Sequence, residues 1–337
     1  MKDLLLKLCQ LNAPSSEENS VRDFIISEIK DYADYKIDPL GNIIAYKQGK
    51  NKAKAKLMLD AHMDEVGVIV TSVTNDGFLK FSDVGSIPVA CLLGSKVNFG
   101  KVCGVIGCKP AHFCKGEEEK KLPDINSLYI DIGANSKEEA EKSVNIGDMG
   151  VLKSEFTWLG GTRFKAKAID DRAGVAALIS LLKEESEYDY YATFTVQEEV
   201  GLRGAKTAAY AVNPQFAICL ECTTAADLCG VSEEDTVCKL GGGPAVSFMD
   251  KATLYNKELY NAALNCGVLA QSKNAVAGGN NSGAIHLTRE GVETLTISLP
   301  CRYIHSQSGV ADYIDLENLK LLARKMKDRI CSGEFLK

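Results

Sequence analysis

The chain has 337 residues, of which 45% are hydrophobic, and a formal net charge of −6. This length suffices for a large core and predicts two domains rather than one. The negative charge and the lack of a basic stripe argue against nucleic acid as a partner, and no apolar run reaches the roughly 18 residues of a membrane span. Residues 1–8 are too short and too charged for a secretory signal, so we expect a cytoplasmic protein with reduced cysteines.

The N-terminal region predicts a helix, a turn and a buried strand. Ser15 and Glu18 have the spacing of a capping box, and an apolar helical face follows them. That face consists of Val21, Phe24, Ile25 and Ile29. Residues 38–42 read Asp-Pro-Leu-Gly-Asn, which is typical of a turn. Residues 57–59 form a short apolar run, which predicts a strand that leads directly into polar residues.

Residues 67–163 have a different pattern, which predicts a small β-rich insertion. Short runs of Val, Ile and Phe alternate there with Gly, Asp and Asn. The runs lie at 68–70, 78–81, 102–106 and 128–132. We expect one helical piece at 137–142 and a charged loop at 116–121. The insertion would divide the catalytic domain into residues 1–66 and 164–337.

Strands and helices alternate again after residue 164. The expected helices are 172–182 and 202–210, and the expected strands are 193–196, 216–220 and 294–299. This alternation predicts an α/β fold with a mostly parallel sheet flanked by helices.

Polar side chains follow the candidate strands, where open α/β sheets bind their ligands. They are His62 and Asp64, Asp170 and Asp171, Glu198 and Glu199, Glu221, and His305. Taken singly, Asp170-Asp171 could be a helix N-cap and Glu198-Glu199 could complement a helix dipole. Their joint occurrence favours a metal site, because imidazoles and carboxylates together suit zinc, cobalt or manganese. Asp64 could orient His62 by accepting its other ring N–H.

Other candidate motifs favour structural roles. An irregularly spaced Cys₃His set could hold zinc; its members are Cys103, Cys108, His112 and Cys114. Cys219 and Cys222 form a CxxC motif, but on a strand these side chains point to opposite faces. The glycines at 241–243 lack the strand–helix context of a phosphate loop.

Four stretches of sequence carry the strongest signal. They are His62-Met63-Asp64-Glu65-Val66-Gly67, Ile169-Asp170-Asp171-Arg172-Ala173-Gly174, Gln197-Glu198-Glu199-Val200-Gly201-Leu202-Arg203-Gly204-Ala205 and Pro300-Cys301-Arg302-Tyr303-Ile304-His305-Ser306. In this order, with a β-rich insertion after the first, they resemble the motifs of the tetrahedral, dodecamer-forming metallo-aminopeptidases. That family includes enzymes labelled glutamyl aminopeptidase and some labelled cellulase or endoglucanase. The resemblance covers essentially the whole chain.

The resemblance implies an enzyme that removes N-terminal residues from short peptides with two divalent metal ions per subunit. The ions would be zinc or cobalt, with manganese as the third candidate. One ion would be held by His62, Asp170 and Glu221, and the other by Asp170, Glu199 and His305. Asp170 would bridge the two ions, Glu198 would be the general base, and Asp64 would orient His62. The Asp170–Asp171 peptide bond would be cis.

The resemblance also implies a homo-oligomer, a dodecamer built from dimers that are joined through the β insertion. Two positions depart from the family pattern. Glu221 stands where the family usually has Asp, and Asn281 replaces an acid that often occurs in that stretch. Metal binding should survive the first change. The second leaves the preferred N-terminal residue open.

Three other functions would fit parts of this pattern. An amidohydrolase that removes acyl groups from amino acids could use the same fold. A glycoside hydrolase would use paired carboxylates and no metal, which leaves His62 and His305 without a role. A non-catalytic assembly protein is disfavoured because every expected ligand position carries a competent side chain.

Overall fold

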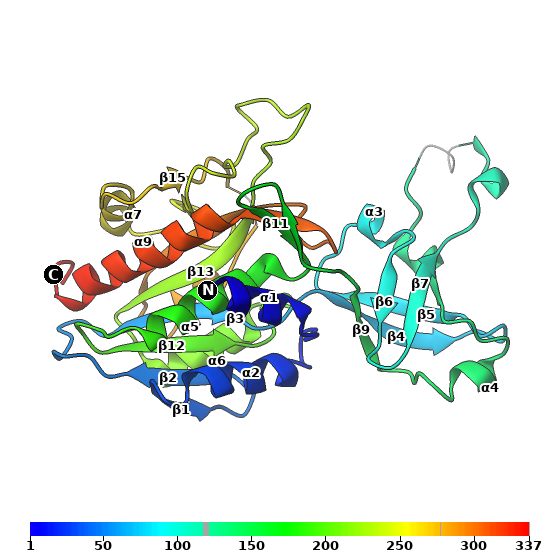
Figure 1. Ribbon diagram of the computed structural model, residues 1–337, viewed down its shortest axis with the longest axis horizontal. Coiled ribbons are helices and arrows are strands. Elements are labelled where there is room, and N and C mark those ends of the chain that lie inside the picture. The colour runs from blue at the N-terminus through cyan, green and yellow to red at the C-terminus, as the bar shows by residue number, and fades with distance from the viewer. Residues whose placement is uncertain (117–120, 277, 337) are drawn as a thin grey trace.

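The computed structural model describes residues 1–116, 121–276 and 278–336. A large α/β body carries a smaller β-barrel at one end (Figure 1). The helices of the described chain are α1 (Lys2–Gln10), α2 (Asn19–Ile29), α3 (Val89–Leu92), α4 (Lys137–Ala140), α5 (Ile169–Lys183), α6 (Arg203–Val212), α7 (Lys257–Leu264), α8 (Ser282–Ile285) and α9 (Tyr313–Cys331), with short 3₁₀ turns η1 (Ala111–Phe113) and η3 (Ile125–Ser127).

The strands divide between the body and the barrel. Those of the body are β1 (Asp34–Ile37), β2 (Ile43–Lys47), β3 (Leu57–His62), β10 (Thr157–Leu159), β11 (Arg163–Ala166), β12 (Tyr190–Thr195), β13 (Phe216–Thr224), β14 (Ala245–Val246), β15 (Gln271–Ser272), β16 (Glu293–Arg302) and β17 (Gly309–Asp312). Those of the barrel are β4 (Gly67–Val73), β5 (Leu79–Val84), β6 (Lys96–Asn98), β7 (Cys103–Gly107), β8 (Tyr129–Asp131) and β9 (Met149–Leu152).

The body is built on one sheet in the order β1-β2-β12-β3-β13-β16-β17-β11-β10, with β14 and β15 attached through β16. The central strands β12, β3, β13 and β16 run parallel. The strands that flank them in this order pair antiparallel, whereas β14 pairs antiparallel with β16 and parallel with β15. The predicted α/β sheet is confirmed, and its parallel part is this central group, whose carboxyl ends meet at one edge.

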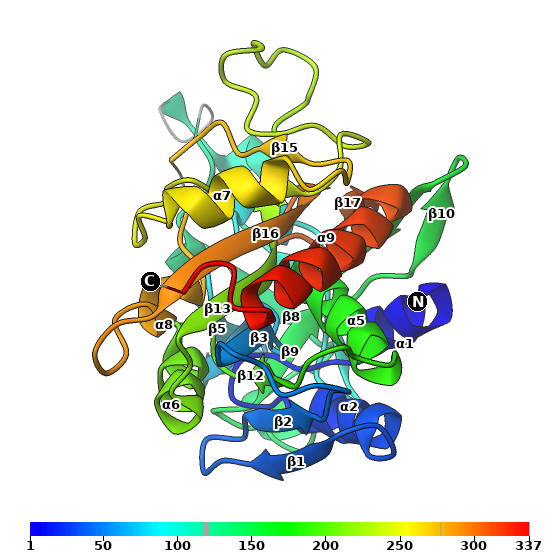
Figure 2. The ribbon, with the colours of Figure 1, turned by 90° about the vertical axis from the view of Figure 1, so that its left-hand side faces the viewer.

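Helices cover both faces of the sheet because the central strands are apolar on both sides. In β3, Leu57 and Leu59 belong to the core cluster that includes α5 and α9, whereas Met58 belongs to the cluster of α6. Figure 2 shows α5 and α9 on one side of the sheet and α6 on the other. The regular part of α5 begins after Asp170 and Asp171, whose backbone angles are not helical.

The insertion forms a closed antiparallel barrel with strand order β4-β5-β8-β7-β6-β9. It has its own core, so it packs as a separate unit. The sequence did not predict β6, β9 or α3. The last strand of the barrel ends at Leu152, and the next strand, β10, pairs with β11 in the large sheet. The sequence placed the end of the insertion later, at residue 163. Most of the charged loop expected at 116–121 lies outside the described residues.

The predicted capping box at the start of α2 is wrong, although the helix itself is confirmed. The Ser15 hydroxyl donates to Asp64 Oδ2 at 2.6 Å instead. Glu18 Oε1 accepts from the backbone N–H groups of Ser16 and Gln197. The long-range contact prevails because Asp64 is fully buried, and a buried carboxylate needs hydrogen-bond donors.

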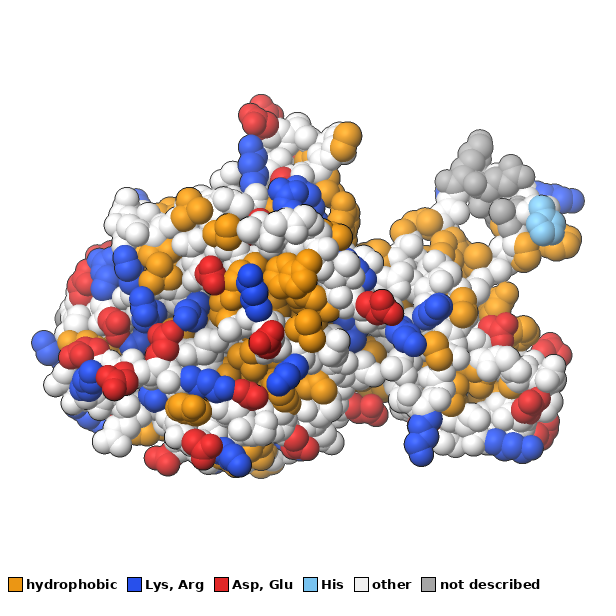
Figure 3. All heavy atoms as spheres, viewed as in Figure 1, with side chains coloured by type: hydrophobic (Ala, Val, Ile, Leu, Met, Phe, Trp, Pro, Cys, Tyr) orange, Lys and Arg blue, Asp and Glu red, His pale blue; other side chains and the backbone are white. Residues whose placement is uncertain are grey.

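The surface charges and the state of the cysteines agree with what the composition predicted. On the face seen in Figure 3, acidic and basic side chains are interspersed and form no basic stripe. All twelve cysteines lie among the described residues, and all are free. Within the described part of the chain, no helix is both long and apolar enough to cross a membrane.

Candidate metal centre

The predicted site residues meet at the carboxyl edge of the central strands, where parallel strands bring their ends together. They are His62 at the end of β3, Glu198 and Glu199 after β12, Glu221 in β13, His305 after β16, and Asp170 at the start of α5. The order of the strands in the sheet therefore places these distant segments side by side.

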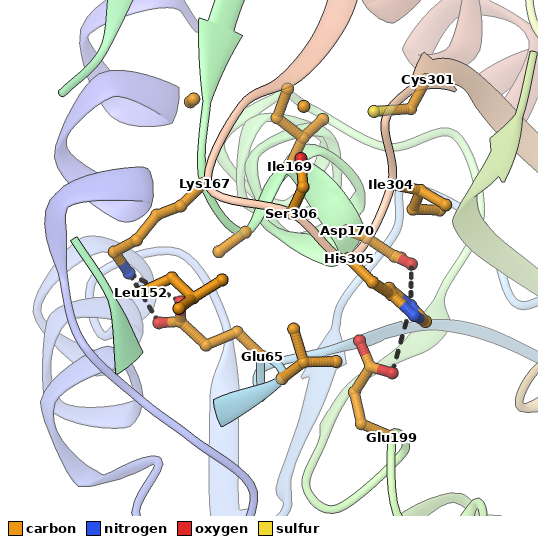
Figure 4. Close-up of a pocket in the computed structure, with 14 residues that line it drawn as sticks. Glu65, Leu152, Lys167, Ile169, Asp170, Glu199, Cys301, Ile304, His305 and Ser306 are labelled. Atoms are coloured by element: carbon orange, nitrogen blue, oxygen red, sulfur yellow. Dashed lines mark hydrogen bonds and ion pairs between the residues drawn. The ribbon is translucent and has the colours of Figure 1, made fainter. Parts of the chain in front are cut away.

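Asp170 lies between the two histidines. Its Oδ1 is 3.3 Å from His62 Nε2, and its Oδ2 is 3.4 Å from His305 Nε2. A second carboxylate faces each imidazole, with Glu221 Oε2 3.7 Å from His62 Nε2 and Glu199 Oε2 3.3 Å from His305 Nε2. Figure 4 shows His305 between Asp170 and Glu199. The site thus has two halves that share Asp170.

Asp64 connects His62 to the loop that carries the glutamates. His62 Nδ1 is 3.2 Å from the Asp64 carbonyl oxygen and 3.4 Å from Oδ1. The Asp64 carboxylate also accepts the backbone N–H groups of Glu198 and Glu199, at 3.0 and 3.2 Å, beside the hydroxyl of Ser15. With Nδ1 facing these acceptors, Nε2 of His62 is directed into the centre.

Strained backbone gathers around the site. Five non-glycine residues near it have positive φ angles, between 52° and 58°: Ala168, Gln197, Leu202, Tyr303 and His305. Such conformations cost on the order of 1–3 kcal/mol each and persist only where the surroundings hold them, typically at functional sites. The Asp170–Asp171 peptide bond is cis, as the resemblance implied.

The electrostatics favour a bound cation. Burial raises the pKa of Glu198 to about 7, and burial together with the charge of Asp170 raises that of Glu199 well above its usual range. For His305, burial acts to lower the pKa, but Asp170 and Glu199 raise it to about 9. Glu199 Oε1 and Asp171 Oδ2 are buried without a hydrogen-bond partner. Crowded carboxylates with unsatisfied oxygens fit divalent metal ions.

The ligand geometry adds two residues, Asp171 and Cys222, to the predicted set. Two groups offer ligand atoms within 4.8 Å of one another: His62 with Asp171 and Glu221, and His62 with Asp170 and Glu199. Asp171 Oδ1 accepts the N–H of Gly174 at 2.9 Å, which leaves Oδ2 as its second oxygen. A third group joins Asp170, Asp171 and Cys222. Among the described residues, the Cys₃His set in the insertion forms no such cluster.

The departure at Asn281 has a structural reason. Its Nδ2 donates to Asp60 Oδ2 at 2.8 Å and to Thr195 Oγ1 at 2.9 Å, while its backbone N–H reaches Glu221 Oε1 at 3.3 Å. Asp60 is fully buried behind the site. Sequence reasoning missed Asp60, and its signal was a charged residue at the end of an apolar strand.

An α/β sheet with histidines and carboxylates at its carboxyl edge is the arrangement of a metal-dependent hydrolase. The family model of the M42 glutamyl aminopeptidases matches residues 41–322. A putative aminopeptidase of Acetivibrio thermocellus is 40% identical over 96% of this chain and 97% of its own length. A lysyl aminopeptidase of Pyrococcus furiosus is 32% identical over 99% and 98%.

Solved structures agree over the same length. A TET aminopeptidase from the marine archaeon Thaumarchaeota archaeon SCGC AB-539-E09 superposes with a TM-score of 0.93 at 32% identity, covering 99% of this chain and 98% of its own. The TET1 peptidase of Pyrococcus horikoshii superposes with a TM-score of 0.83 at 34% identity, covering 96% and 98%. The chain belongs to the M42 family of aminopeptidases, which are metallopeptidases.

Proposed function

We propose that this aminopeptidase releases single N-terminal residues from peptides by means of two divalent metal ions that share Asp170. The observation that carries the proposal is the position of Asp170, with one carboxylate oxygen facing His62 and the other facing His305. A carboxylate that addresses two imidazoles through different oxygens can bridge two ions, whereas a single-ion site would need only one of these faces.

The ligands divide as the halves of the site do. One ion would be held by His62, Asp170 and Glu221, and the other by Asp170, Glu199 and His305. Imidazole and carboxylate donors suit zinc and cobalt, and also manganese. When bound, such a pair of ions supplies Lewis-acid chemistry that acidifies a shared water and polarises the scissile carbonyl.

Glu198 is proposed as the general base because it is adjacent to a ligand without being one. Its backbone N–H donates to Asp64 Oδ1, and its carboxyl group interacts with the charges of His62, Asp170 and His305. It would accept a proton from the attacking water and deliver it to the departing amine as the peptide C–N bond breaks. Burial raises the pKa of Glu198, which favours a carboxylate able to accept a proton, whereas bound cations would act in the opposite direction.

The carboxylates also support recognition of a free N-terminus. They attract the substrate ammonium, which can lose its proton and bind as a neutral amine beside His62 and Glu221. This contact would hold the adjacent carbonyl against the water, and such positioning accounts for a large part of many enzymatic rate accelerations. The family description names glutamyl and one relative is named lysyl, so the proposal covers N-terminal residues without choosing the side chain.

The experiment compares one peptide in free and N-acetylated forms, with the protein reconstituted with zinc or cobalt, and reads the products by mass. We expect stepwise loss of single residues from the free peptide only. Release of acetate from the capped peptide would indicate an amidohydrolase, and equal cleavage of both forms or internal cuts would refute the proposal. Glycoside hydrolysis without metal would support the remaining alternative.

We also propose that the chain forms a large homo-oligomer built from dimers, with the barrel as the dimerisation domain. The Pyrococcus horikoshii relative can assemble into a tetrahedron or a large octahedral shell. Light scattering of the metal-loaded protein should therefore give the mass of a dodecamer or a larger shell. A monomer under these conditions would contradict the proposal.

A further inference from the structure

The half of the site formed by Glu199 and His305 is contacted by a turn from the barrel. This turn, Gly85-Ser86, directly follows β5 and lies beside Val66, because Val84 pairs with Gly67 where the chain enters the barrel. Among the hydrogen bonds of the described residues, this turn provides the one contact between the barrel and the proposed metal ligands.

Ser86 determines which nitrogen of His305 faces the centre. The backbone carbonyl oxygen of Ser86 is 2.8 Å from His305 Nδ1. A carbonyl oxygen can only accept a hydrogen bond, so Nδ1 must carry the proton. The lone pair of the neutral imidazole then sits on Nε2, which faces Asp170 and Glu199. This tautomer is the one that can bind a cation at the centre.

Gly85 allows the turn to pack against the other ligand of the same half. A Cβ atom on Gly85 would lie 2.8 Å from Val66 Cγ1 and 3.2 Å from the Cβ of Glu199. The φ angle of Gly85 is +80°, a conformation that side chains disfavour. The close approach therefore requires glycine, and any added side chain would displace the turn, Val66 or Glu199.

Ile87 fixes the turn to the barrel. Its side chain is 5% exposed and belongs to the barrel core. The Ser86 carbonyl is thus held between a buried anchor on one side and the glycine contact on the other. His305 itself has a positive φ and is partly exposed, so it depends on this contact for its orientation.

We propose that the Gly85-Ser86 turn is a positioning element through which the barrel sets the affinity of the ion held by Asp170, Glu199 and His305. The inference rests on the proposed two-ion site. It assigns the insertion a role in metal binding that is separate from any role in oligomer assembly. Displacing the turn should weaken this ion and leave the ion at His62 and Glu221 in place.

Gly85→Ala tests the inference, with Gly94→Ala as its matched control. Gly94 lies in the same domain with a φ of +72°, but a Cβ there would meet nothing within 4 Å. The two variants therefore share the backbone strain and differ in contact with the site. Ser86→Ala is a second control, because it keeps the carbonyl group that accepts from His305.

The readouts are metal content by elemental analysis and the affinity of each ion from cobalt titration followed by visible absorption. We expect two ions per subunit in the wild type and in both controls. Gly85→Ala should bind its second ion about 10–100-fold more weakly, the range seen when groups that orient ligands are lost. Equal affinity in Gly85→Ala and Gly94→Ala would overturn the inference.

Two further outcomes distinguish a failure of this inference from a misfolded variant and from a failure of the proposed two-ion site. If Gly85→Ala does not fold, Ile87→Val replaces it, with Ile106→Val as control, since both isoleucines lie in the barrel core. A weaker second ion in Ile87→Val alone supports the inference, and equal affinities refute it. If the wild type binds fewer than two ions, the proposed two-ion site is wrong and this inference falls with it.

Discussion

The two halves of the site are built in different ways. His62 and Glu221 lie on neighbouring parts of the sheet, and their side chains are 1% and 4% exposed. His305 lies on a loop beyond β16, with its side chain 26% exposed, and its Nδ1 contacts the Ser86 carbonyl of the barrel. Glu199 likewise lies beyond the end of β12.

The difference shows which contacts hold the side chains of each half in place. Strand residues are held by ladder hydrogen bonds and core packing, so the half formed by His62 and Glu221 is organised before any ion binds. Loop residues need additional contacts, and fixing them on binding costs conformational entropy. The loop half should therefore bind its ion more weakly.

The largest expected effect concerns Glu198, which belongs to neither half. Glu198→Gln should lower kcat by about 10²–10⁴-fold, because an amide cannot accept the proton of the water. Its metal content should match that of the wild type. Steady-state kinetics and elemental analysis of the same sample check both points. An unchanged kcat, or loss of an ion, would show that Glu198 has another role.

Stepwise removal of metal should distinguish the two halves of the site by the affinity of the ion that each one holds. With a graded chelator, the ion of the loop half should leave first, at an affinity at least about tenfold weaker, which corresponds to about 1.4 kcal/mol. His305→Ala should contain one ion per subunit from the start and lack this first step. His62→Ala should instead disturb the ion that is held more tightly. Simultaneous loss of both ions in the wild type would contradict the comparison.

Asn281→Asp should destabilise the strand half. The new carboxylate would replace the N–H donors now given to Asp60 and Thr195, and it would face the carboxylate of Asp60. Buried polar groups left unsatisfied cost about 1–3 kcal/mol each. Chemical denaturation of the metal-free protein should show a loss of this size. The exposed Asn274→Asp is the control, and equal stability of the two variants would argue against the role of Asn281.

The smallest effect is expected for Ser15→Ala, which removes the hydroxyl donor to Asp64. A hydrogen bond to a carboxylate contributes about 1.5–3 kcal/mol to stability. Asp64 keeps the backbone N–H donors of Glu198 and Glu199 and acts on the metal only through His62, so metal affinity should fall only a few-fold. Competition with a chromophoric chelator measures it. Ser20→Ala is the control, since Ser20 lies nearby, in the first turn of α2, and its hydroxyl also donates a hydrogen bond, to the backbone carbonyl of Asn12. Lower stability with unchanged metal affinity would restore the helix-capping interpretation of Ser15.

Much of the fold followed from local patterns. The alternation of apolar strands and amphipathic helices predicted the α/β body, and the short Val and Ile runs predicted the β insertion. The antiparallel edge strands of the large sheet were not predicted, and neither were β6 and β9 of the barrel. Short or half-exposed strands carry too few apolar residues to be recognised without their partners.

The sequence by itself determined the chemical types of the candidate site residues and their places after the strands. His62, Glu199 and His305 each follow a recognisable strand, and parallel strands must bring such positions to one edge. Only the tertiary structure decided which oxygen of Asp170 faces which imidazole. It also recruited Ser15, Asn281 and the carbonyl of Ser86. These contacts join segments far apart in the chain, and a backbone carbonyl is present at every residue, so no local pattern could single them out.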